Sequence, residues 1–145
     1  AFCRDLFGVG QTILSGEDGR EPIEQVTEAF GGELPTAVFD ATGFPPSMNA
    51  AFDLTGSGGR LTMVSLVQAD ITFNDPEFHR KELTVFATRN STAADFRRII
   101  SLIESGTADT TPWITHRADF DGMIGEFENW LDPEFGVIKA MVEVG

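Results

Sequence analysis

The sequence predicts an α/β fold, and three consecutive features of residues 36–67 predict it. Residues 36–41 form a short apolar run that stops at Thr42-Gly43, as expected of a strand that is buried on both faces. Pro45 then opens a segment with apolar residues at helical spacing, and residues 61–67 form a second apolar run. A strand, a helix and a strand within this length are typical of a parallel crossover unit.

The helix of this unit is expected to begin at Pro45 and to end at Gly58-Gly59, because glycine adopts the left-handed conformation of a helix C-terminus without a Cβ clash. One side of the helix carries the residues that we expect to pack on the sheet: Met48, Ala51, Phe52 and Thr55. The rest of the chain is interpreted as the flanks of this unit.

The residues before this unit predict one further strand between two helices. Residues 1–8 look like the last two turns of a helix, so the chain is expected to have been cut within that helix. Residues 11–15 are expected to form a short strand and residues 16–19 a loop. A second helix is expected from Pro22 to Gly31-Gly32, with Ile23, Val26 and Phe30 on one face.

Helices and strands continue to alternate after residue 67. A short polar helix is expected over residues 76–82 and a strand over residues 83–87. Thr92 and Asp95 form a capping box in front of an apolar helical pattern that Gly106 closes. This alternation predicts a doubly wound parallel sheet with helices on both faces.

The pattern changes near the C-terminus. Residues 113–117 are expected to be extended, and Asp119 can cap a helix that ends before Pro133. Residues 136–145 alternate between apolar and mixed side chains, which predicts a half-buried strand of a different sheet. The expected helix carries its apolar residues at helical spacing: Phe120, Met123, Ile124, Phe127 and Leu131.

Composition and charge exclude several classes of function. The formal net charge of −13 and the pI near 4.3 argue against nucleic acid, whose phosphates would be repelled. The sequence has no apolar run of about 18 residues and no signal peptide, which argues against membrane insertion and secretion. The single cysteine, Cys3, excludes an internal disulfide and a cysteine-built zinc site, and fits a reducing compartment. We therefore expect a cytoplasmic protein.

Three predicted strand ends share one edge of the sheet. Ligands of open parallel sheets lie beyond the carboxyl ends of the strands. Small residues and backbone groups at this edge would let a flat ring approach closely: Thr42-Gly43, Val64-Ser65-Leu66 and Ala87-Thr88-Arg89. Spacing alone does not distinguish this edge from that of other doubly wound domains.

Five short motifs follow one another in a fixed order. They are Phe-Asp-Ala-Thr-Gly (39–43), Gly-Gly-Arg-Leu-Thr-Met-Val (58–64), Asp-Pro-Glu-Phe-His-Arg-Lys-Glu-Leu-Thr (75–84), Ile-Thr-His-Arg (114–117) and Val-Ile-Lys-Ala (137–140). Together they resemble the C-terminal half of zinc-type medium-chain alcohol dehydrogenases, above all the polyol, threonine and sugar-acid dehydrogenases. The resemblance covers essentially the whole chain but less than half of a full family member. The chain therefore looks like a C-terminal fragment.

The resemblance implies NAD(P)-dependent oxidation of a secondary alcohol in a polyol, a sugar acid or a similar small substrate. In the family, hydride passes to nicotinamide while a zinc ion polarises the substrate oxygen. The residues that the resemblance assigns to the cofactor lie at the three strand ends: Thr42 and Gly43 beside the ribose; Val64, Ser65 and Leu66 at the nicotinamide through backbone groups; and Ala87, Thr88 and Arg89 at the carboxamide and the substrate cleft. Ser65 stands where the family usually has glycine.

Other parts of the family's pattern are absent. Its G-x-G-x-x-G turn and ribose-binding acidic residue precede position 1, and its zinc ligands come from an N-terminal domain. The resemblance therefore implies zinc in the missing N-terminal part, no catalytic or metal-binding residue in this chain, and no activity of this chain alone. It also implies that residues 1–110 belong to the nucleotide-binding domain and that residues 111–145 return to the catalytic domain.

Two other functions remain open. A zinc-free reductase of the same superfamily would share the hydride chemistry and lack the metal ligands. A truncated, non-catalytic module would serve in interaction or assembly, and weak or absent dinucleotide binding would favour it.

Several polar residues have both a functional and a structural interpretation. Arg89 is a substrate-side cation or a surface arginine that pairs with a carboxylate. His116 is a proton shuttle or a structural histidine, and Asp40 either orients a loop near the cofactor or stabilises the fold. Cys3 is expected to be a small core residue, and His79 a surface residue.

The family's strand order predicts a gap in the sheet. It places the two missing first strands between residues 11–15 and residues 36–41, which leaves two rows of unpaired backbone groups. Further residues of the polypeptide fill this gap, or the strand at residues 11–15 moves beside Val38, or another chain fills it. In the family the strand near residues 83–87 can lie close to a subunit interface, so a homo-oligomer is expected.

Overall fold

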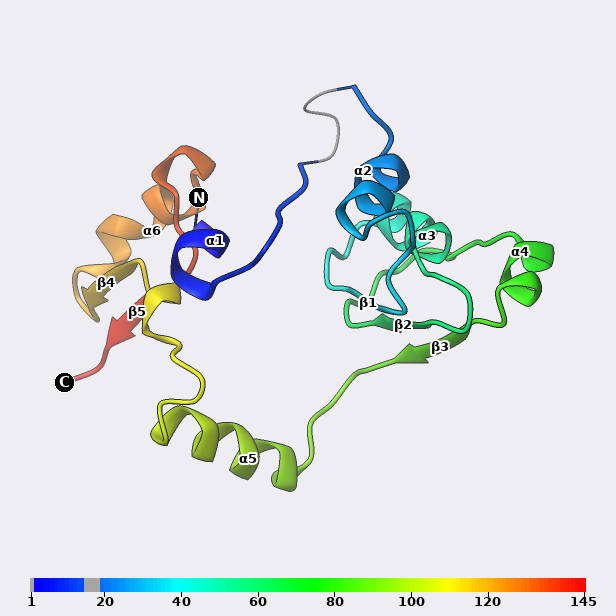
Figure 1. Ribbon diagram of the computed structural model, residues 1–145. Helices are drawn as coiled ribbons and strands as arrows, with labels where there is room; N and C mark the ends of the chain where they lie inside the picture. The colour runs from blue at the N-terminus through cyan, green and yellow to red at the C-terminus, as the bar shows by residue number, and fades with distance from the viewer. Residues whose placement is uncertain (1, 15–18) are drawn as a thin grey trace. The chain divides into compact units, whose positions relative to one another are not determined.

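The computed structural model describes residues 2–14 and 19–145 and divides the chain into two compact units. The first unit ends at Asn90 and the second begins at Ser91. Figure 1 shows the helices and strands of both units. Ala1, Ser15 and residues 16–18, which the sequence assigns to a helix, a strand and a loop, lie outside the described residues. The domain boundary at residue 110 stays a prediction.

A three-stranded parallel sheet forms the centre of the first unit. Its strands are β1 (Ala37–Asp40), β2 (Arg60–Met63) and β3 (Thr84–Ala87), in the spatial order β1-β2-β3. Helix α3 (Pro45–Asp53) connects β1 to β2 and packs on both strands (Figure 1). The parallel crossover unit that residues 36–67 predict is therefore confirmed.

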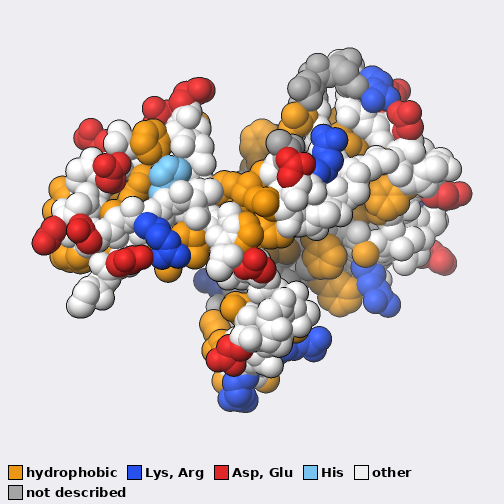
Figure 2. All heavy atoms as spheres, turned by 60° about the vertical axis from the view of Figure 1, so that its left-hand side comes forward, with side chains coloured by type: hydrophobic (Ala, Val, Ile, Leu, Met, Phe, Trp, Pro, Cys, Tyr) orange, Lys and Arg blue, Asp and Glu red, His pale blue; other side chains and the backbone are white. Residues whose placement is uncertain are grey.

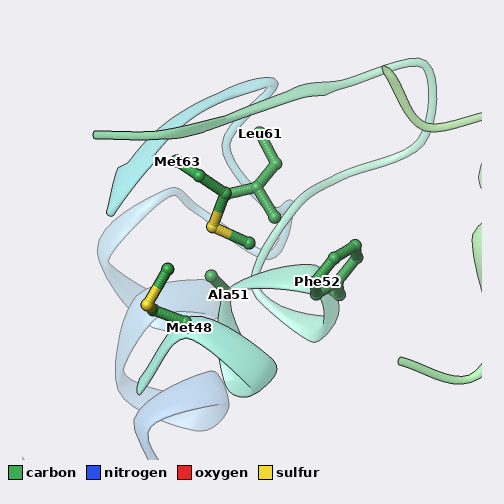
Figure 3. Close-up of a cluster of buried hydrophobic side chains, with 5 residues drawn as sticks. All are labelled: Met48, Ala51, Phe52, Leu61 and Met63. Carbon is green, nitrogen blue, oxygen red and sulfur yellow. The ribbon is translucent and has the colours of Figure 1, made fainter. Parts of the chain in front are cut away.

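The core of the first unit lies between α3 and β2. Figure 3 shows the side chains of Leu61 and Met63 facing those of α3. Leu61 is fully buried. The α3 residues in this cluster are those that the helical spacing predicts: Met48, Ala51 and Phe52. The fourth predicted residue, Thr55, follows the helix and is also fully buried.

Aromatic side chains attach the chain after β2 to the same core. Phe73 stacks on Phe52 with ring centroids 4.8 Å apart, and Phe78 lies 5.0 Å from Phe73 in a tilted arrangement. Such pairs add to the free energy gained from burial of the rings. Phe78 belongs to the short helix α4 (Asp75–Arg80), so these contacts connect α4 to α3.

Two further helices of the first unit agree with the sequence, and one predicted strand does not form. Helices α1 (Phe2–Phe7) and α2 (Pro22–Ala29) occupy their expected positions, although Phe30 lies beyond α2 and is more than half exposed. The strand predicted for residues 11–15 is wrong for residues 11–14, which pair with no strand of the described chain. An extended segment without a neighbour gains no ladder hydrogen bonds. The arrangement beside Val38 is therefore excluded.

Helix α3 ends at Asp53, well before the predicted Gly58-Gly59, because a tight turn follows it. The Gly56 N–H donates to the Pro35 carbonyl at 2.9 Å, and the Gly59 N–H donates to the Gly56 carbonyl at 3.0 Å. These bonds occupy backbone groups that a longer helix would use. The following strand is also shorter than the predicted residues 61–67, since the chain leaves the sheet after Met63.

The face of the sheet opposite α3 is open within the first unit. Phe39, Thr62 and Phe86 lie side by side across the three strands. Because side chains alternate along a strand, they point away from the face that carries Leu61. Phe39 is 70% exposed and Phe86 is 49% exposed. The sequence predicts helices on both faces, and among the described elements of this unit only the α3 face is packed.

Lys81 is buried although it carries a charge, and it joins the end of α4 to the end of α3. Its Nζ donates to the carbonyl oxygens of Asp53 at 2.9 Å and Thr55 at 3.0 Å. Carbonyl groups at a helix C-terminus lack intrahelical donors and carry partial negative charge, so an ammonium group is favourable there.

Replacing Lys81 with methionine is expected to lower the free energy of unfolding of the first unit by about 2 kcal/mol, because two carbonyl groups lose their donor while the packing volume is kept. Amide hydrogen exchange of residues 60–63 measures this change. Lys139→Met, at an exposed position, is the matched control and is expected to stay within about 0.5 kcal/mol of the parent. Equal stability of the two variants would contradict the role given to Lys81.

The second unit contains a separate two-stranded parallel sheet. Strands β4 (His116–Asp119) and β5 (Ala140–Glu143) pair along their whole length, and helix α6 (Met123–Leu131) connects them. The prediction that the last strand belongs to a different sheet is confirmed. A short 3₁₀ turn, η1 (Thr111–Trp113), precedes β4, and a second, η2 (Pro133–Phe135), lies between α6 and β5.

Three boundaries in the second unit differ from the sequence prediction. The predicted extended stretch at residues 113–117 begins in a 3₁₀ turn, and the last strand covers residues 140–143 only. Helix α6 begins at Met123, so Phe120 lies outside it. The cause is a turn in which Asp119 Oδ1 accepts from the Gly122 N–H at 2.6 Å.

Helix α5 (Ala93–Glu104) begins with the predicted capping box. The Asp95 carboxylate accepts from the Thr92 N–H at 2.8 Å, and the Thr92 hydroxyl accepts from the Asp95 N–H at 3.3 Å. The hydrogen bond from the Thr92 backbone lowers the pKa of Asp95 below its ordinary value. The apolar residues of this helix are exposed within the described chain: Phe96, Ile99, Ile100 and Ile103.

Charged side chains of both signs are distributed over the surface, with hydrophobic side chains exposed between them (Figure 2). Within residues 2–14 and 19–145, we find no helix with the length and apolarity that crossing a membrane requires.

Candidate cofactor site at the strand ends

The three strand-end segments that the sequence singles out meet at one edge of the first unit's sheet. The strands are parallel and in register, so their carboxyl ends lie together: Asp40 is paired with Met63, and Met63 with Ala87. The Val64 N–H donates to the Asp40 carbonyl at 2.8 Å, and the Thr88 N–H donates to the Met63 carbonyl at 3.0 Å. These bonds continue the ladder into the loops, so all three segments leave the sheet from the same place.

The first segment, Thr42-Gly43, is held by side-chain hydrogen bonds. The Thr42 N–H and hydroxyl both donate to Asp40 Oδ1, at 3.1 and 3.0 Å. Gly43 has a φ of 63°, which a residue with a Cβ adopts only with strain. A Cβ built on Gly43 would lie 3.8 Å from the Ser65 Cβ, so the first and second segments are in close proximity.

The second segment, Val64-Ser65-Leu66, has some backbone groups occupied and others open. The N–H groups of Val64 and Ser65 both donate to the Asp40 carbonyl, at 2.8 and 3.4 Å. They are therefore not available to a ligand. The Leu66 N–H has no hydrogen-bond partner among the described residues. The side chains of Val64 and Leu66 are exposed.

The third segment, Ala87-Thr88-Arg89, is exposed along its whole length. The Thr88 N–H donates to the Met63 carbonyl of β2. Arg89 forms no ion pair with any carboxylate of the described chain. The surface interpretation of Arg89, in which it pairs with a neighbouring carboxylate, therefore has no support in this geometry. A free guanidinium at a strand end is suited to an anionic group.

Other residues with candidate roles do not build a second site. His116 Nδ1 lies 2.9 Å from the Thr115 hydroxyl and its ring lies against Phe135, which fits the structural interpretation. His79 is exposed beside Asp75. Cys3 is exposed on α1, so its predicted place in a core is wrong; no described residue of that short helix is buried.

No group of three or more His, Cys, Asp or Glu residues in the described part of the chain could hold a metal ion. The residues present therefore do not fit a zinc site.

Comparison with known proteins identifies the family of this chain. The family model for zinc-binding dehydrogenases matches residues 1–105. The chain belongs to the zinc-binding dehydrogenase family. It is 34% identical over 118 residues to the L-galactonate-5-dehydrogenase of Escherichia coli (strain K12), a match that covers 81% of this chain and 35% of that protein.

Two further similar proteins show the same partial overlap. The L-arabinitol 4-dehydrogenase of Hypocrea jecorina is 27% identical over 131 residues, covering 90% of this chain and 34% of that protein. The crystal structure described as a short chain alcohol dehydrogenase from E. coli CFT073, in complex with NADH, has a TM-score of 0.74 and 24% identity, covering 92% of this chain and 38% of that one. The chain thus spans about a third of the length of the curated relatives that it matches.

The family assignment confirms the resemblance that the five motifs indicate, and the structural match confirms the α/β fold. Sequence reasoning missed one residue of this edge. Ser47 Oγ donates to Asp40 Oδ2 at 2.9 Å from the first turn of α3. The sequence does contain a signal for Ser47: its hydroxyl comes directly after Pro45-Pro46, near an expected helix N-terminus and close to an acidic residue at a strand end.

Proposed function

We propose that this chain forms the nicotinamide side of the cofactor site in a zinc-type, NAD(P)-dependent dehydrogenase that oxidises a secondary alcohol. The observation that carries the proposal is the meeting of three strand-end segments at the carboxyl edge of a parallel sheet, in a member of the zinc-binding dehydrogenase family. Ligands of doubly wound folds lie at this edge.

The proposed roles are those that the family resemblance implies, and the geometry of each segment supports them. Thr42 and Gly43 lie beside the ribose, where the left-handed backbone of Gly43 brings the chain close without a side chain. Val64, Ser65 and Leu66 face the nicotinamide ring, and the open Leu66 N–H is a donor for its carboxamide. Ala87 and Thr88 flank the same group. A nicotinamide bound at this edge would supply the hydride acceptor for oxidation of the alcohol carbon.

Zinc, the phosphate-binding turn and the substrate pocket apart from Arg89 are proposed to come from parts of the protein outside these residues. The substrate is proposed to be a polyol or a sugar acid, because the two curated relatives described above are named for an alditol and a sugar acid. We also propose a cytoplasmic location, on the basis of the single cysteine.

A homo-oligomer is part of the proposal. Strand β3 pairs with β2 on one side, and among the described strands its other edge is unpaired and exposed. An open edge strand presents unpaired N–H and carbonyl groups to another chain. A second copy of this chain, pairing along β3, would satisfy them.

The test uses the full polypeptide that carries this chain, supplied with zinc. Titration with NADH and with NADPH, followed by nicotinamide fluorescence, measures cofactor binding, and NAD(P)H formation measures oxidation of arabinitol and of galactonate. Binding with turnover supports the proposal. Turnover that is unchanged after zinc is removed favours the zinc-free reductase, and absence of dinucleotide binding favours the non-catalytic module.

Arg89→Ala is expected to raise the KM for a sugar acid by about tenfold and to change the KM for a neutral polyol much less, since only the acid offers a carboxylate to the guanidinium. Steady-state kinetics with both substrates measures the difference. Arg60→Ala, at the amino end of β2, is the matched control and is expected to leave both KM values unchanged. A uniform effect on both substrates would contradict a substrate-side role for Arg89.

A further inference from the structure

Asp40 places a buried carboxylate at the end of β1. Asp40 is only 5% exposed. Within the described residues, no lysine, arginine or histidine forms an ion pair with it. Because a buried charge is costly unless it is paired or hydrogen-bonded, its hydrogen bonds decide what this residue does.

The carboxylate binds both sides of the first strand-end loop. Oδ1 accepts from the Thr42 N–H at 3.1 Å and from the Thr42 hydroxyl at 3.0 Å. Oδ2 accepts from the Ser47 hydroxyl at 2.9 Å. The Thr42 hydroxyl in turn accepts from the Phe44 N–H at 3.2 Å. One side chain therefore connects the strand end, the loop and the first turn of α3.

The backbone of the same residue holds the second loop. The Asp40 carbonyl accepts from the N–H groups of Val64 and Ser65, at 2.8 and 3.4 Å. The relative position of the Thr42-Gly43 and Val64-Ser65 segments thus depends on Asp40 from both its side chain and its main chain. The negative charge also lies near the N-terminus of α3, where a helix favours an anion.

We propose that Asp40 is a positioning residue for the dinucleotide: it fixes Thr42-Gly43 against residues 64–66 and so sets the surface that receives the nicotinamide and its ribose. This inference rests on the proposed function. Asp40 touches no cofactor atom in this scheme; it acts through the loop. Displacement of a binding loop by about 1 Å is enough to reduce catalysis by up to about 100-fold.

Two variants separate the hydrogen bonds from the bulk of the side chain. Asp40→Asn keeps one oxygen for Thr42, and its amide can donate to a reoriented Ser47 hydroxyl, so most of the loop geometry is retained. Asp40→Ala removes every acceptor. The matched control is Thr55→Val, because the Thr55 hydroxyl is buried and donates to the Ala51 carbonyl at 2.7 Å, not to either loop.

The experiment measures the Kd for NADH and NADPH, the KM values for dinucleotide and alcohol, and the Tm of each variant of the full polypeptide. Asp40→Ala is expected to raise the Kd and the KM for the preferred dinucleotide about tenfold and to leave the KM for the alcohol nearly unchanged. Asp40→Asn is expected to recover most of this loss. Thr55→Val is expected to lower the Tm and to keep dinucleotide affinity within about twofold of the parent.

Two results would overturn the inference: parental dinucleotide affinity in folded Asp40→Ala, or an equal loss of affinity in Thr55→Val at the same decrease in Tm. If Asp40→Ala does not fold, Ser47→Ala tests the inference instead, since it removes a single hydrogen bond to the carboxylate. Unchanged dinucleotide affinity in Ser47→Ala would count against the inference. A parent protein that binds neither dinucleotide would refute the proposed function itself, which is a separate outcome.

Discussion

Replacing Leu61 with alanine is expected to lower the free energy of unfolding of the first unit by about 2–5 kcal/mol. Leu61 is fully buried, at the centre of the cluster that joins β2 to α3 (Figure 3). The loss combines the transfer free energy of the removed atoms with the cavity that they leave. Met48 and Met63 line that cavity and are flexible enough to fill part of it, which favours the middle of this range.

The choice of probe matters for Leu61→Ala. Both tryptophans of the chain, Trp113 and Trp130, belong to the second unit, so the first unit contains no tryptophan whose fluorescence could be followed. Amide hydrogen exchange of residues 37–40 and 60–63 reports on it directly. Leu14→Ala is the matched control, because Leu14 is 64% exposed. Comparable losses of protection in the two variants would show that the core lies elsewhere.

Gly56→Ala is expected to lower the free energy of unfolding of the first unit by about 3 kcal/mol or more, because the new Cβ meets backbone atoms that cannot move aside. That Cβ would lie 2.6 Å from the carbonyl oxygen of Leu34. The Gly56 N–H also donates to the Pro35 carbonyl, so the turn after α3 and the chain before β1 are fixed against each other. Relief of the clash would break this bond.

Gly10→Ala provides the control for Gly56→Ala, since a Cβ at Gly10 meets no atom within 4 Å. It is expected to change the free energy of unfolding by less than about 0.5 kcal/mol. Thermal unfolding followed by far-UV circular dichroism, together with hydrogen exchange of β2, measures both variants. Parental stability of Gly56→Ala would mean that the segment at residues 34–35 is free to shift.

The helices and the central strands could be predicted because their signals are local. Pro22 and Pro45 mark helix starts, Thr92 and Asp95 form a capping box, and apolar spacing identifies the residues of α3 that become buried. Each of these features acts within about one turn of a helix, so no distant contact is needed to recognise it.

Boundaries and isolated strands depend on contacts that the sequence does not show. Helix α3 ends at Asp53 because the Gly56 N–H donates to the Pro35 carbonyl across the turn. Residues 11–14 have a strand pattern but no neighbouring strand among the described residues, so they form no ladder. The start of α6 depends on the bond between Asp119 and Gly122.

For the candidate site, the family motifs predict which strand ends to consider, whereas the bonds at those ends are decided by the folded chain. The predicted backbone contacts of Val64 and Ser65 illustrate the difference, because their N–H groups are already bonded to Asp40.

By itself, the sequence determined the α/β class, the parallel crossover, the family and the three candidate strand ends, since periodicity, capping and motif order are encoded in neighbouring residues. Only the tertiary structure decided that Asp40 joins Thr42, Ser47 and the loop after β2. The reason is physical: a buried carboxylate takes whichever donors the packed chain brings within about 3 Å, here those of Thr42 and Ser47. The Asp40 carbonyl bonds the loop after β2 only because folding pairs β1 with β2.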